Sequence, residues 1–306
     1  MNQPMPSEQA FDVRHYILGR RALPPSILAK ESRVFVYPGS ITVVNGQTGN
    51  LSINIHDDAY FLVEQIQIIS SDQTVNQDKA TVQITDTTSS QSWSNIPVPL
   101  RDLAGNGNNP KYLAHPNILR PSSNLVFAIT NNSGADATYY VALVGRKIKG
   151  ITAADVNLLV RRMWYQYVLN VTALGASALN QRFSLQVYNE SDFMLYKLLS
   201  QELVNAVIGA TGGAVSQEVT FNLKDTTTDT DLMADFVAAR LLFGAMQSDQ
   251  LPTANIWGQG APFCLKKPWL IRRNGIIQGT FNNLSTTAHT SGFKLTLEGI
   301  RIFDAA

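Results

Sequence analysis

An internal repeat limits what this chain can fold into, and it is clearest in one short motif. Residues 110–120 read Pro-Lys-Tyr-Leu-Ala-His-Pro-Asn-Ile-Leu-Arg, and residues 262–272 repeat the pattern Pro-x-x-Leu-x-x-Pro-x-x-x-Arg at an offset of 152. Between 110–133 and 262–285, six of 24 positions are identical, where ordinary composition predicts about one or two. A single match of this kind can arise by chance, so the same test is needed along the rest of the chain.

Other segments align at similar offsets. Residues 51–63 match the apolar pattern of 183–195 at an offset of 132, and residues 81–88 match 220–227 at 139. At the end of each copy, alternating apolar residues from Tyr139 and from Phe293 align at 154. The offset only grows, as expected if the second copy carries longer loops. We therefore interpret the chain as two tandem copies of one unit.

Each copy reads as a series of short strands. Residues 51–56, Leu-Ser-Ile-Asn-Ile-His, alternate between apolar and polar, which indicates a strand with one buried face. Asn45-Gly46 predicts a tight hairpin turn after the apolar run 41–44. About eight short strands in about 115 residues are typical of a β-sandwich or jelly roll. The predicted fold is all-β, with two tandem antiparallel jelly-roll-like β-sandwiches.

The remaining segments complete the predicted domain organisation. Four prolines and little periodicity predict an extended N-terminal arm, which would lie on its own domain or on a neighbouring subunit. Thr152-Ala-Ala-Asp155 resembles a capping box and predicts a short linking helix. The predicted parts are the arm at 1–32, the first sandwich at 33–150, the linking helix at 151–164 and the second sandwich at 165–306.

The two copies are expected to differ most in one connection. After Asp231, the apolar residues of the second copy recur at helical spacing up to Gly244, which predicts a helical insertion near 231–244. The first copy has Pro97 and Pro99 opposite this segment, so no helix is expected there.

The repeated motif is interpreted as a structural anchor rather than a ligand site. Proline cannot donate to a β-ladder, so the second proline of each motif is expected to begin an edge strand. The leucine would point inward, and the arginine would reach outward or pair with a carboxylate. The residues concerned are Leu113, Pro116 and Arg120 in the first copy and Leu265, Pro268 and Arg272 in the second.

The charge pattern favours contacts with proteins over contacts with nucleic acid. The formal net charge is +1, so there is no electrostatic basis for specific nucleic-acid binding. Charged residues make up 15% of the chain, below the usual quarter. A surface with few charges suits large contact areas with neighbours, although a weakly charged free domain remains an alternative. The N-terminus lacks a signal-peptide pattern and no apolar stretch is long enough to span a membrane.

No constellation predicts catalysis or metal binding. The four histidines include no His-x-His pair and have no carboxylate partner at metal-ligand spacing; they are His15, His56, His115 and His289. His56-Asp57-Asp58 reads as a solvated turn, and the loop with Asp225, Asp229 and Asp231 lacks the pattern of a known calcium loop. The single Cys264 is expected to be a small buried residue. We therefore predict no catalytic, cofactor-binding or metal-binding residues and no cofactor.

The pattern resembles the virion structural proteins of bacteriophages. It combines a proline-rich arm, two jelly-roll-like units, low charge and turns rich in Asn and Thr. In the second copy, residues 262–272, 282–285 and 293–303 look like the closing strands of β-rich phage particle components. The resemblance covers about 33–303 and implies a double-jelly-roll capsid protein or a capsid-associated protein.

Two functions follow as hypotheses. The first is a non-enzymatic virion component, made in the host cytoplasm, whose partners are other virion proteins and its own copies, with a trimer as one option. The second is a collar, tail-fibre or receptor-binding protein that recognises a glycan through aromatic side chains on a loop rim. Candidates for that rim are Trp93, Trp257 and Trp269, although a tryptophan is buried by default. A hydrolase remains a third alternative, because many β-sandwich enzymes have weak sequence signatures.

Overall fold

The structure is a computed structural model of the 306-residue chain. It describes residues 30, 32–71, 80–104, 111–202, 219–239, 242, 263–284, 288 and 293–304. The predicted arm lies outside the described residues except for Lys30 and Ser32, and so do Trp257, His15 and His289.

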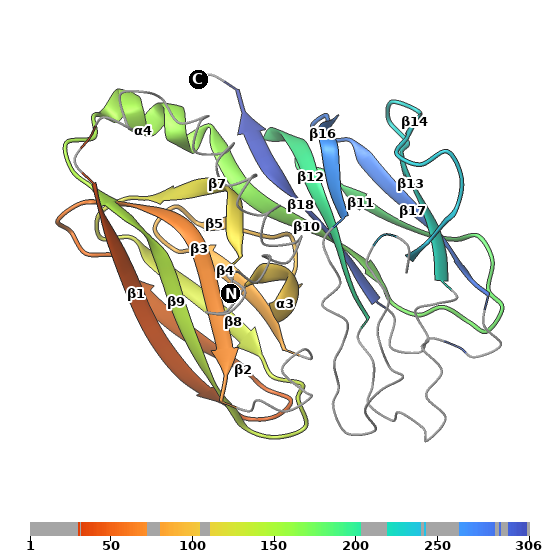
Figure 1. Ribbon diagram of the computed structural model, residues 1–306, viewed down its shortest axis with the longest axis horizontal. Helices are drawn as coiled ribbons and strands as arrows, with labels where there is room; N and C mark the ends of the chain where they lie inside the picture. The colour runs from red at the N-terminus through yellow and green to blue at the C-terminus, as the bar shows by residue number, and fades with distance from the viewer. Residues whose placement is uncertain are drawn as a thin grey trace, which may run out of the picture. The chain divides into compact units, whose positions relative to one another are not determined.

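The first copy folds into two antiparallel sheets (Figure 1). One sheet has the order β1-β9-β3-β7, and the other has the order β2-β8-β4-β5 with β6 also pairing β4. The strands are β1 (Ser32–Val43), β2 (Thr48–Asn54), β3 (Tyr60–Ser70), β4 (Thr81–Asp86), β5 (Gln91–Ser92), β6 (Val98–Pro99), β7 (Tyr112–Leu119), β8 (Asn124–Thr130) and β9 (Ala137–Ile148).

The second copy repeats this order strand for strand. Its sheets are β10-β18-β12-β16 and β11-β17-β13-β14, with β15 also pairing β13. Its strands are β10 (Arg162–Val171), β11 (Gln181–Gln186), β12 (Ser191–Glu202), β13 (Val219–Asp225), β14 (Thr230–Asp231), β15 (Val237–Ala238), β16 (Phe263–Ile271), β17 (Ile276–Asn283) and β18 (Phe293–Phe303). The predicted all-β double sandwich is thus confirmed.

By contacts the chain divides into two compact units. The first comprises residues 1–166 and 299–306, and the second comprises residues 167–298. The start of β10 and the end of β18 therefore belong to the first unit, although the repeat assigns both strands to the second copy.

Strands adjacent in sequence mostly lie in different sheets, which is the jelly-roll connection. β1 pairs β9 and β2 pairs β8, so the hairpin predicted at Asn45-Gly46 is wrong. The turn itself exists, because Gly46 has a φ of 76°. The Asn45 backbone N–H donates to Asp136 at 3.0 Å, and its side-chain oxygen accepts from the Gly134 N–H at 2.8 Å. A turn signal defines the reversal of the chain but leaves the partner strand open, and here long-range contacts decide the pairing.

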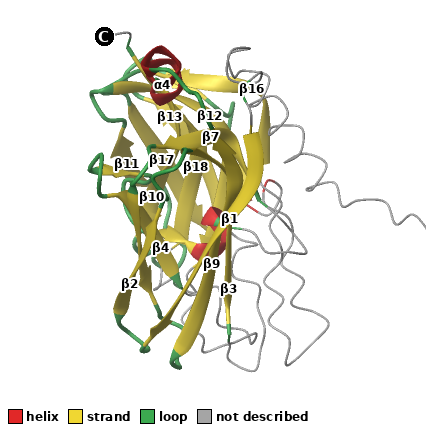
Figure 2. Ribbon diagram, turned by 90° about the vertical axis from the view of Figure 1, so that its left-hand side faces the viewer, coloured by secondary structure: helices red, strands yellow, loops and turns green. Residues whose placement is uncertain are grey.

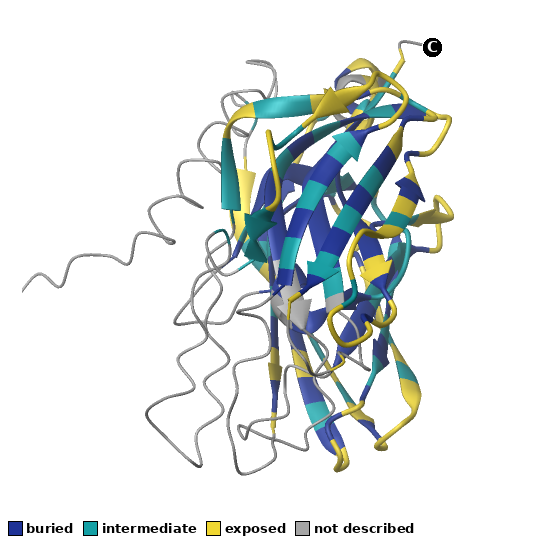
Figure 3. Ribbon diagram, turned by 90° about the vertical axis from the view of Figure 1, so that its right-hand side faces the viewer, coloured by how far each residue is buried: buried dark blue, intermediate teal, exposed yellow. Residues whose placement is uncertain are grey.

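The core of each copy comes from alternation along the strands. β8 alternates residue by residue between half-buried and buried positions, with Leu125, Phe127 and Ile129 fully buried, and β13 does the same with Phe221 and Leu223. Figure 2 shows how strands dominate the described residues, and Figure 3 shows the alternation of burial along them. Alternation with period two places one face of each sheet in the core.

The repeated motif lies on the edge strand of its sheet in both copies. The edge position is confirmed, but the proline lies inside β7 or β16 and does not begin it. Val63 of β3 pairs with Asn117 of β7, and Gln65 pairs with Tyr112. Residues 113–116 of β7 therefore bulge opposite the single residue Glu64. In the second copy, Leu195 of β12 pairs with Trp269 of β16, and Lys197 pairs with Cys264. Residues 265–268 of β16 therefore bulge opposite Tyr196. A bulge frees the proline from donating to the ladder, which explains why it is tolerated within the strand.

The predicted linking helix is present as α4 (Ala153–Val160). Its capping box forms as expected, because the Asp155 N–H donates to the Thr152 hydroxyl at 3.2 Å and the Asp155 carboxylate accepts from the Thr152 N–H at 3.1 Å. The helix ends at Val160, and Met163 lies in β10 rather than in the helix.

The helix predicted near 231–244 does not begin where expected. Residues 232–235 form bends and Val237–Ala238 form β15, which pairs with Thr220 and Phe221 of β13. The first copy has the same arrangement, with β6 followed by α3 (Leu100–Leu103). The residues at positions 239 and 242 are helical, at the offset of 139 from the ends of α3. Strand pairing overrides the helical spacing at Val237 and Ala238, and the described residues of this connection are arranged alike in the two copies.

Two buried polar residues recur as structural anchors. The Asn131 side chain donates to the carbonyls of Val43 at 2.9 Å and Ala135 at 2.8 Å, and the Asn283 side chain donates to that of Gly175 at 2.8 Å. Both asparagines are fully buried. Their identity in the repeat therefore reflects satisfied hydrogen bonds in the core.

Candidate functional site

Two tyrosines show which residues of the opening strands are equivalent. The Tyr37 hydroxyl accepts from the His56 N–H at 3.1 Å, and the Tyr167 hydroxyl accepts from the Tyr188 N–H at 2.9 Å. The Tyr37 ring also meets Phe61, and the Tyr167 ring meets Phe193, each with a centroid distance of 4.8 Å in edge contact. β1 and β10 therefore align at an offset of 130 (37 to 167).

The outer face of the first copy's β1-β9-β3 sheet carries exposed apolar side chains. Val34 and Val36 of β1 are 68% and 45% exposed, Tyr140 of β9 is 49% exposed and Ile69 of β3 is 45% exposed. Ile69 and Tyr140 are paired across their strands, and Val34 and Val36 lie further along the same sheet face. We call Val34, Val36, Tyr140 and Ile69 the β1 face. Exposed apolar residues that cluster on one sheet face indicate an interaction surface.

The equivalent face of the second copy's opening strand is covered. Trp164 and Gln166 of β10, which correspond to Val34 and Val36, are 0% exposed. The Trp164 N–H donates to the Asn117 side chain at 2.7 Å, and the Gln166 side chain donates to the Asp102 carbonyl at 2.7 Å. These contacts lie inside the first compact unit. One chain therefore contains a covered and an uncovered version of the same strand face.

The edge strands show the opposite difference. β7 supplies Asn117 to the contact with Trp164, and six of its eight residues are buried. In the equivalent strand β16, only Ile271 is buried; Lys266, Lys267 and Leu270 are exposed, and Trp269, which corresponds to Asn117, is half-buried. We call these four residues, Lys266, Lys267, Trp269 and Leu270, the β16 edge. β7, which is mostly buried, thus has a counterpart in the second copy, β16, whose side chains are mostly not buried.

His56-Asp57-Asp58 is an exposed turn, as predicted, but the sequence did not show that it holds a lysine. The buried Lys147 ammonium lies 2.6 Å from Asp58 Oδ1 and 3.1 Å from His56 Nδ1. It also lies 4.2 Å from the centroid of the Phe35 ring, a cation–π contact. The hydrogen bond from Lys147 holds the pKa of Asp58 below its ordinary value. The cation bound by this cluster is therefore the chain's own lysine.

The same contact recurs in the repeat. Arg301, at an offset of 154 from Lys147, lies 5.0 Å from the Tyr165 ring, and Tyr165 corresponds to Phe35. A cation over an aromatic ring is therefore part of the repeated architecture and not a ligand site.

The aspartates of the 225–231 loop have structural partners. The Asp225 carboxylate accepts from the N–H of Thr227 at 2.9 Å, which closes the turn after β13. Asp229 forms an ion pair with Lys224 at 2.6 Å, and the hydrogen bond and charge of Lys224 lower the pKa of Asp229. Asp86 closes the equivalent turn in the first copy through the N–H of Thr88. These roles account for the repeated Asp-Thr-Thr sequence without a metal.

The other predicted candidates lie apart from one another. Cys264 is half-buried rather than buried. His115 is buried on β7, where burial and then the positive charge of Arg162 lower its pKa to about 4. Trp93 is buried against Trp164, with ring centroids 6.3 Å apart, so it does not belong to an exposed aromatic rim.

The described residues hold neither a metal-binding cluster nor a long apolar helix. They contain no group of three or more His, Cys, Asp and Glu side chains placed to hold a metal ion. No helix among them is long and apolar enough to cross a membrane.

The sequence reasoning missed the β1 face. Residues 34–37 read Val-Phe-Val-Tyr, which is apolar at every position, so the pattern does not show which side faces solvent. The offset of 130 to the covered strand β10 was the available signal, and it becomes visible only once Tyr37 and Tyr167 are seen to be equivalent.

Comparisons with known proteins give likenesses of structure only. No protein-family model and no curated protein sequence matches the chain. The atomic structure of Sulfolobus turreted icosahedral virus is similar with a TM-score of 0.47 and 12% identity, over 89% of this chain and 91% of that one. The major capsid protein of bacteriophage PM2 is similar with a TM-score of 0.44 and 9% identity, over 90% and 98%. Recombinant N-glycanase F is similar with a TM-score of 0.39 and 8% identity, over 89% and 96%. At these values the matches describe the arrangement of strands, and they include an enzyme as well as viral proteins.

Proposed function

We propose that this protein is a non-enzymatic structural component of a virus particle, a capsid or capsid-associated protein of a bacteriophage, that assembles with its own copies. The observation that carries the proposal is the difference in burial between equivalent strands. β10 is covered on its outer face, whereas β1 exposes Val34 and Val36 at the same positions.

The occupant of the β1 face is a second copy of the chain. Within one chain, Asn117 of β7 accepts from the Trp164 backbone N–H, and the Trp93 ring packs against the Trp164 ring. The uncovered counterparts are the β1 face and the β16 edge, so each chain has both halves of one further contact of the same kind. Joining the β1 face of one chain to the β16 edge of the next gives a head-to-tail contact, which forms a ring when the rotation closes. A ring of three chains would contain six copies of the repeat.

The chemistry of the surfaces fits an assembly protein. The β1 face consists of three aliphatic side chains and one tyrosine, none of them charged at neutral pH, which suits burial against another protein. Its sheet is formed by long-range pairing of β1 with β9, so the face is held rigid before any partner arrives. A rigid apolar face loses little conformational entropy on association.

Charge reversal on the β1 face tests the proposal. The double variant Val34→Asp/Val36→Asp of the full chain should be monomeric, whereas the unchanged protein should form a ring or larger assembly, as measured by light scattering with size-exclusion chromatography. Leu179→Asp, at a side chain that is exposed but belongs to neither surface, is the matched control and should assemble normally.

A mixing experiment tests whether the contact is head-to-tail. Leu270→Asp should also be monomeric, because it changes the β16 edge. An equimolar mixture of Leu270→Asp with Val34→Asp/Val36→Asp should form one-to-one pairs, since each variant keeps the surface that the other has lost. The proposal is contradicted if each variant alone assembles to the size of the unchanged protein. It is also contradicted if the unchanged full chain, with its N-terminal arm, is a monomer.

A further inference from the structure

A backbone contact in the first unit shows what binds the outer edge of an opening strand. Ser94, which follows β5, forms an isolated parallel bridge with Gln166 of β10. The Gln166 N–H donates to the Trp93 carbonyl at 3.0 Å, and the Asn95 N–H donates to the Gln166 carbonyl at 3.4 Å. Ser94, Trp93 and Gln166 are all buried. Because β10 is an edge strand, this bridge pairs backbone groups that the edge would otherwise leave open.

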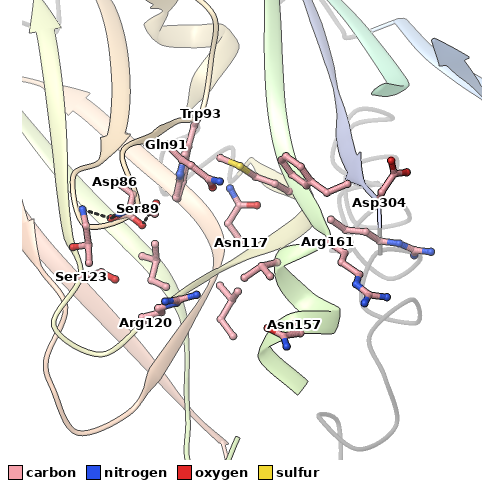
Figure 4. A pocket seen from close by; sticks show the side chains of 17 residues that line it. Asp86, Ser89, Gln91, Trp93, Asn117, Arg120, Ser123, Asn157, Arg161 and Asp304 are labelled. Carbon is pink, nitrogen blue, oxygen red and sulfur yellow. Dashed lines mark hydrogen bonds between the residues drawn. The ribbon is translucent and has the colours of Figure 1, made fainter. Parts of the chain in front are cut away.

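The packing beside this bridge is incomplete. The first unit has a cavity of about 470 Å³ whose lining includes Trp93 and Asn117, with Arg120 and Arg161 toward its opposite ends (Figure 4). Figure 4 shows Trp93 and Asn117 in the middle part of the lining, between Ser123 on one side and Arg161 on the other. Side-chain packing is therefore discontinuous here, and the two backbone hydrogen bonds define how the segment and the strand align.

The second copy repeats the segment that makes this bridge. The Leu232 N–H donates to the Leu223 carbonyl at 2.9 Å, and the Trp93 N–H donates to the Ile84 carbonyl at the same distance. Donors and acceptors are both separated by the offset of 139 that relates the two copies in this region. The residue after Leu232, Met233, is therefore the counterpart of the bridging serine.

The repeated segment is more open than its counterpart. Met233 is half-buried and residues 234–236 are exposed, whereas Ser94 is buried. Ser94 and Gln166 form the only isolated bridge among the described residues, so Met233 has no equivalent bridge there. The segment thus has the shape of a bridging element without its strand edge.

The matching strand edge belongs to β1. Val36 corresponds to Gln166 at the offset of 130 and is exposed. It pairs with Val144 of β9 on one side, and no backbone hydrogen bond joins it to a described residue on the other. Pro38 lies in the same strand without an N–H to donate, as suits a position whose nitrogen faces away from the neighbouring strand. Residues two apart direct their backbone groups to the same side, so the N–H and C=O of Val36 also point away from β9.

The charges of the two elements are complementary. The residues of segment 230–236 include two carboxylates, those of Asp231 and Asp235, and no cation. β1 carries a single charge, that of Arg33, whose side chain is 63% exposed. The equivalent segment 91–97, which pairs within the chain, is uncharged. The open version of the segment therefore carries the charge that a basic strand edge attracts.

We infer that Met233 of one chain forms a parallel backbone bridge with Val36 of the next chain. The inference rests on the proposed function, in which a second copy covers the β1 face, and it adds the segment and the register that join the two chains. The Val36 N–H donates to the Leu232 carbonyl of the neighbouring chain, and the Val36 carbonyl accepts from the N–H of Ala234 of that chain. Addition of an extended segment to a strand edge supplies directed hydrogen bonds, which the apolar β1 face alone does not.

Disulfide cross-linking of the full chain tests the register. Val36→Cys/Met233→Cys, in a Cys264→Ala background, should form disulfides between chains when treated with oxidised glutathione. Directly opposed residues of a bridge lie within the Cα separation of about 4.4–6.8 Å that a disulfide needs. Denaturing electrophoresis without reductant should therefore show cross-linked dimers and larger species as the main products.

Two further pairs in the same background are the controls. Ser94→Cys/Gln166→Cys should cross-link within a single chain, because these residues are opposed in the existing bridge. Val36→Cys/Leu179→Cys keeps one cysteine in place and moves the other to an exposed residue outside the segment, and it should not cross-link between chains.

The outcomes distinguish this inference from the proposed function. Before oxidation, Val36→Cys/Met233→Cys should have the size of the unchanged protein by light scattering. If it assembles but cross-links between chains no faster than Val36→Cys/Leu179→Cys, the bridge is wrong and the proposed function stands. Cross-linking of Val36→Cys/Met233→Cys within one chain also overturns the inference. An unchanged protein that is a monomer contradicts the proposed function, and the inference with it.

Discussion

The two copies of the repeat carry different side chains at one equivalent pair of positions and bury them to different depths. In the first copy, Gln65 of β3 pairs across the sheet with Val144 of β9, and both of these uncharged side chains are half-buried. In the second copy, the corresponding residues are Lys197 and Glu298, which form an ion pair at 3.5 Å with both side chains 0% exposed. One pair of positions thus holds a half-buried uncharged pair in the first copy and a fully buried ion pair in the second.

The difference shows that the ion pair is not required by the architecture. Removing two charges from water costs several kcal/mol per ion, and mutual attraction repays this cost only with good geometry. The first copy forms the same strand pairing without the cost. We therefore expect the Lys197–Glu298 pair to add little net stability, and the residues of the first copy supply a direct test.

The largest expected effect comes from breaking this pair on one side. Lys197→Met should lower the free energy of unfolding by about 3–5 kcal/mol, because the buried Glu298 carboxylate would lose the ammonium group that balances its charge. The double variant Lys197→Gln/Glu298→Val, which carries the residues of the first copy, should lie within about 1 kcal/mol of the unchanged protein or be more stable. Urea denaturation measures both. Equal destabilisation by the single and double variants would show that the pair itself is essential.

The second effect concerns a histidine present in one copy only. His115 is buried on β7, whereas the corresponding Lys267 is exposed on β16. With its pKa lowered to about 4, the folded protein keeps His115 neutral while the unfolded chain takes up a proton near pH 6.5. Its contribution to stability is therefore constant above about pH 6.5 and falls by about 3 kcal/mol as the pH is lowered to about 4.

The His115→Gln variant isolates this contribution. The difference in unfolding free energy between the variant and the unchanged protein should shift by about 3 kcal/mol between pH 7 and pH 4, in favour of the variant at low pH. Chemical denaturation at several pH values measures it, and carboxylates that titrate in the same range cancel in the difference. A difference that does not change with pH would place His115 in contact with water.

The smallest effect is expected at the paired motif arginine. Arg272 is 65% exposed and meets Asp192 at the surface, so Arg272→Gln should cost no more than about 1 kcal/mol. Arg120→Gln, which removes no ion pair, should leave the unfolding free energy unchanged within about 0.5 kcal/mol. Thermal or urea unfolding compares the two variants, and a larger loss for Arg120→Gln would mean that its cavity is a structural feature.

The sequence allowed the double sandwich to be predicted because its signals are local or repeated. Alternation marked strands such as β2, the capping box marked α4, and the offset of the motif marked equivalent edge strands. Which strands pair with each other was harder to predict, because Asn45-Gly46 specifies a turn but not the strand with which β1 pairs. The start of the helix expected near 231–244 was wrong because pairing of Val237 with Phe221 outweighs a helical spacing, whereas positions 239 and 242 are helical.

Sites formed by distant residues were the least predictable. Arg120 and Arg161 approach one cavity only because β7 and β10 lie together in the fold. The partner of Asp58, Lys147, is separated from it by 89 positions. Neither pairing leaves a pattern in the sequence, whereas the repeat does, and so the comparison of equivalent positions was the most informative route to function.

The pairing of β1 with β9 has a consequence for how the chain reaches its folded state. The hydroxyls of Thr42 and Thr138, which are hydrogen-bonded at 2.8 Å between these strands, are 96 positions apart. β1 therefore has no partner during synthesis until nearly all of the first copy has left the ribosome. Closing such long loops is slow, and a second copy with similar strands then competes for the same partners. The two copies have different residues at equivalent positions, for example Gln65 against Lys197 and Pro38 against Val168. These differences favour pairing of each strand within its own copy.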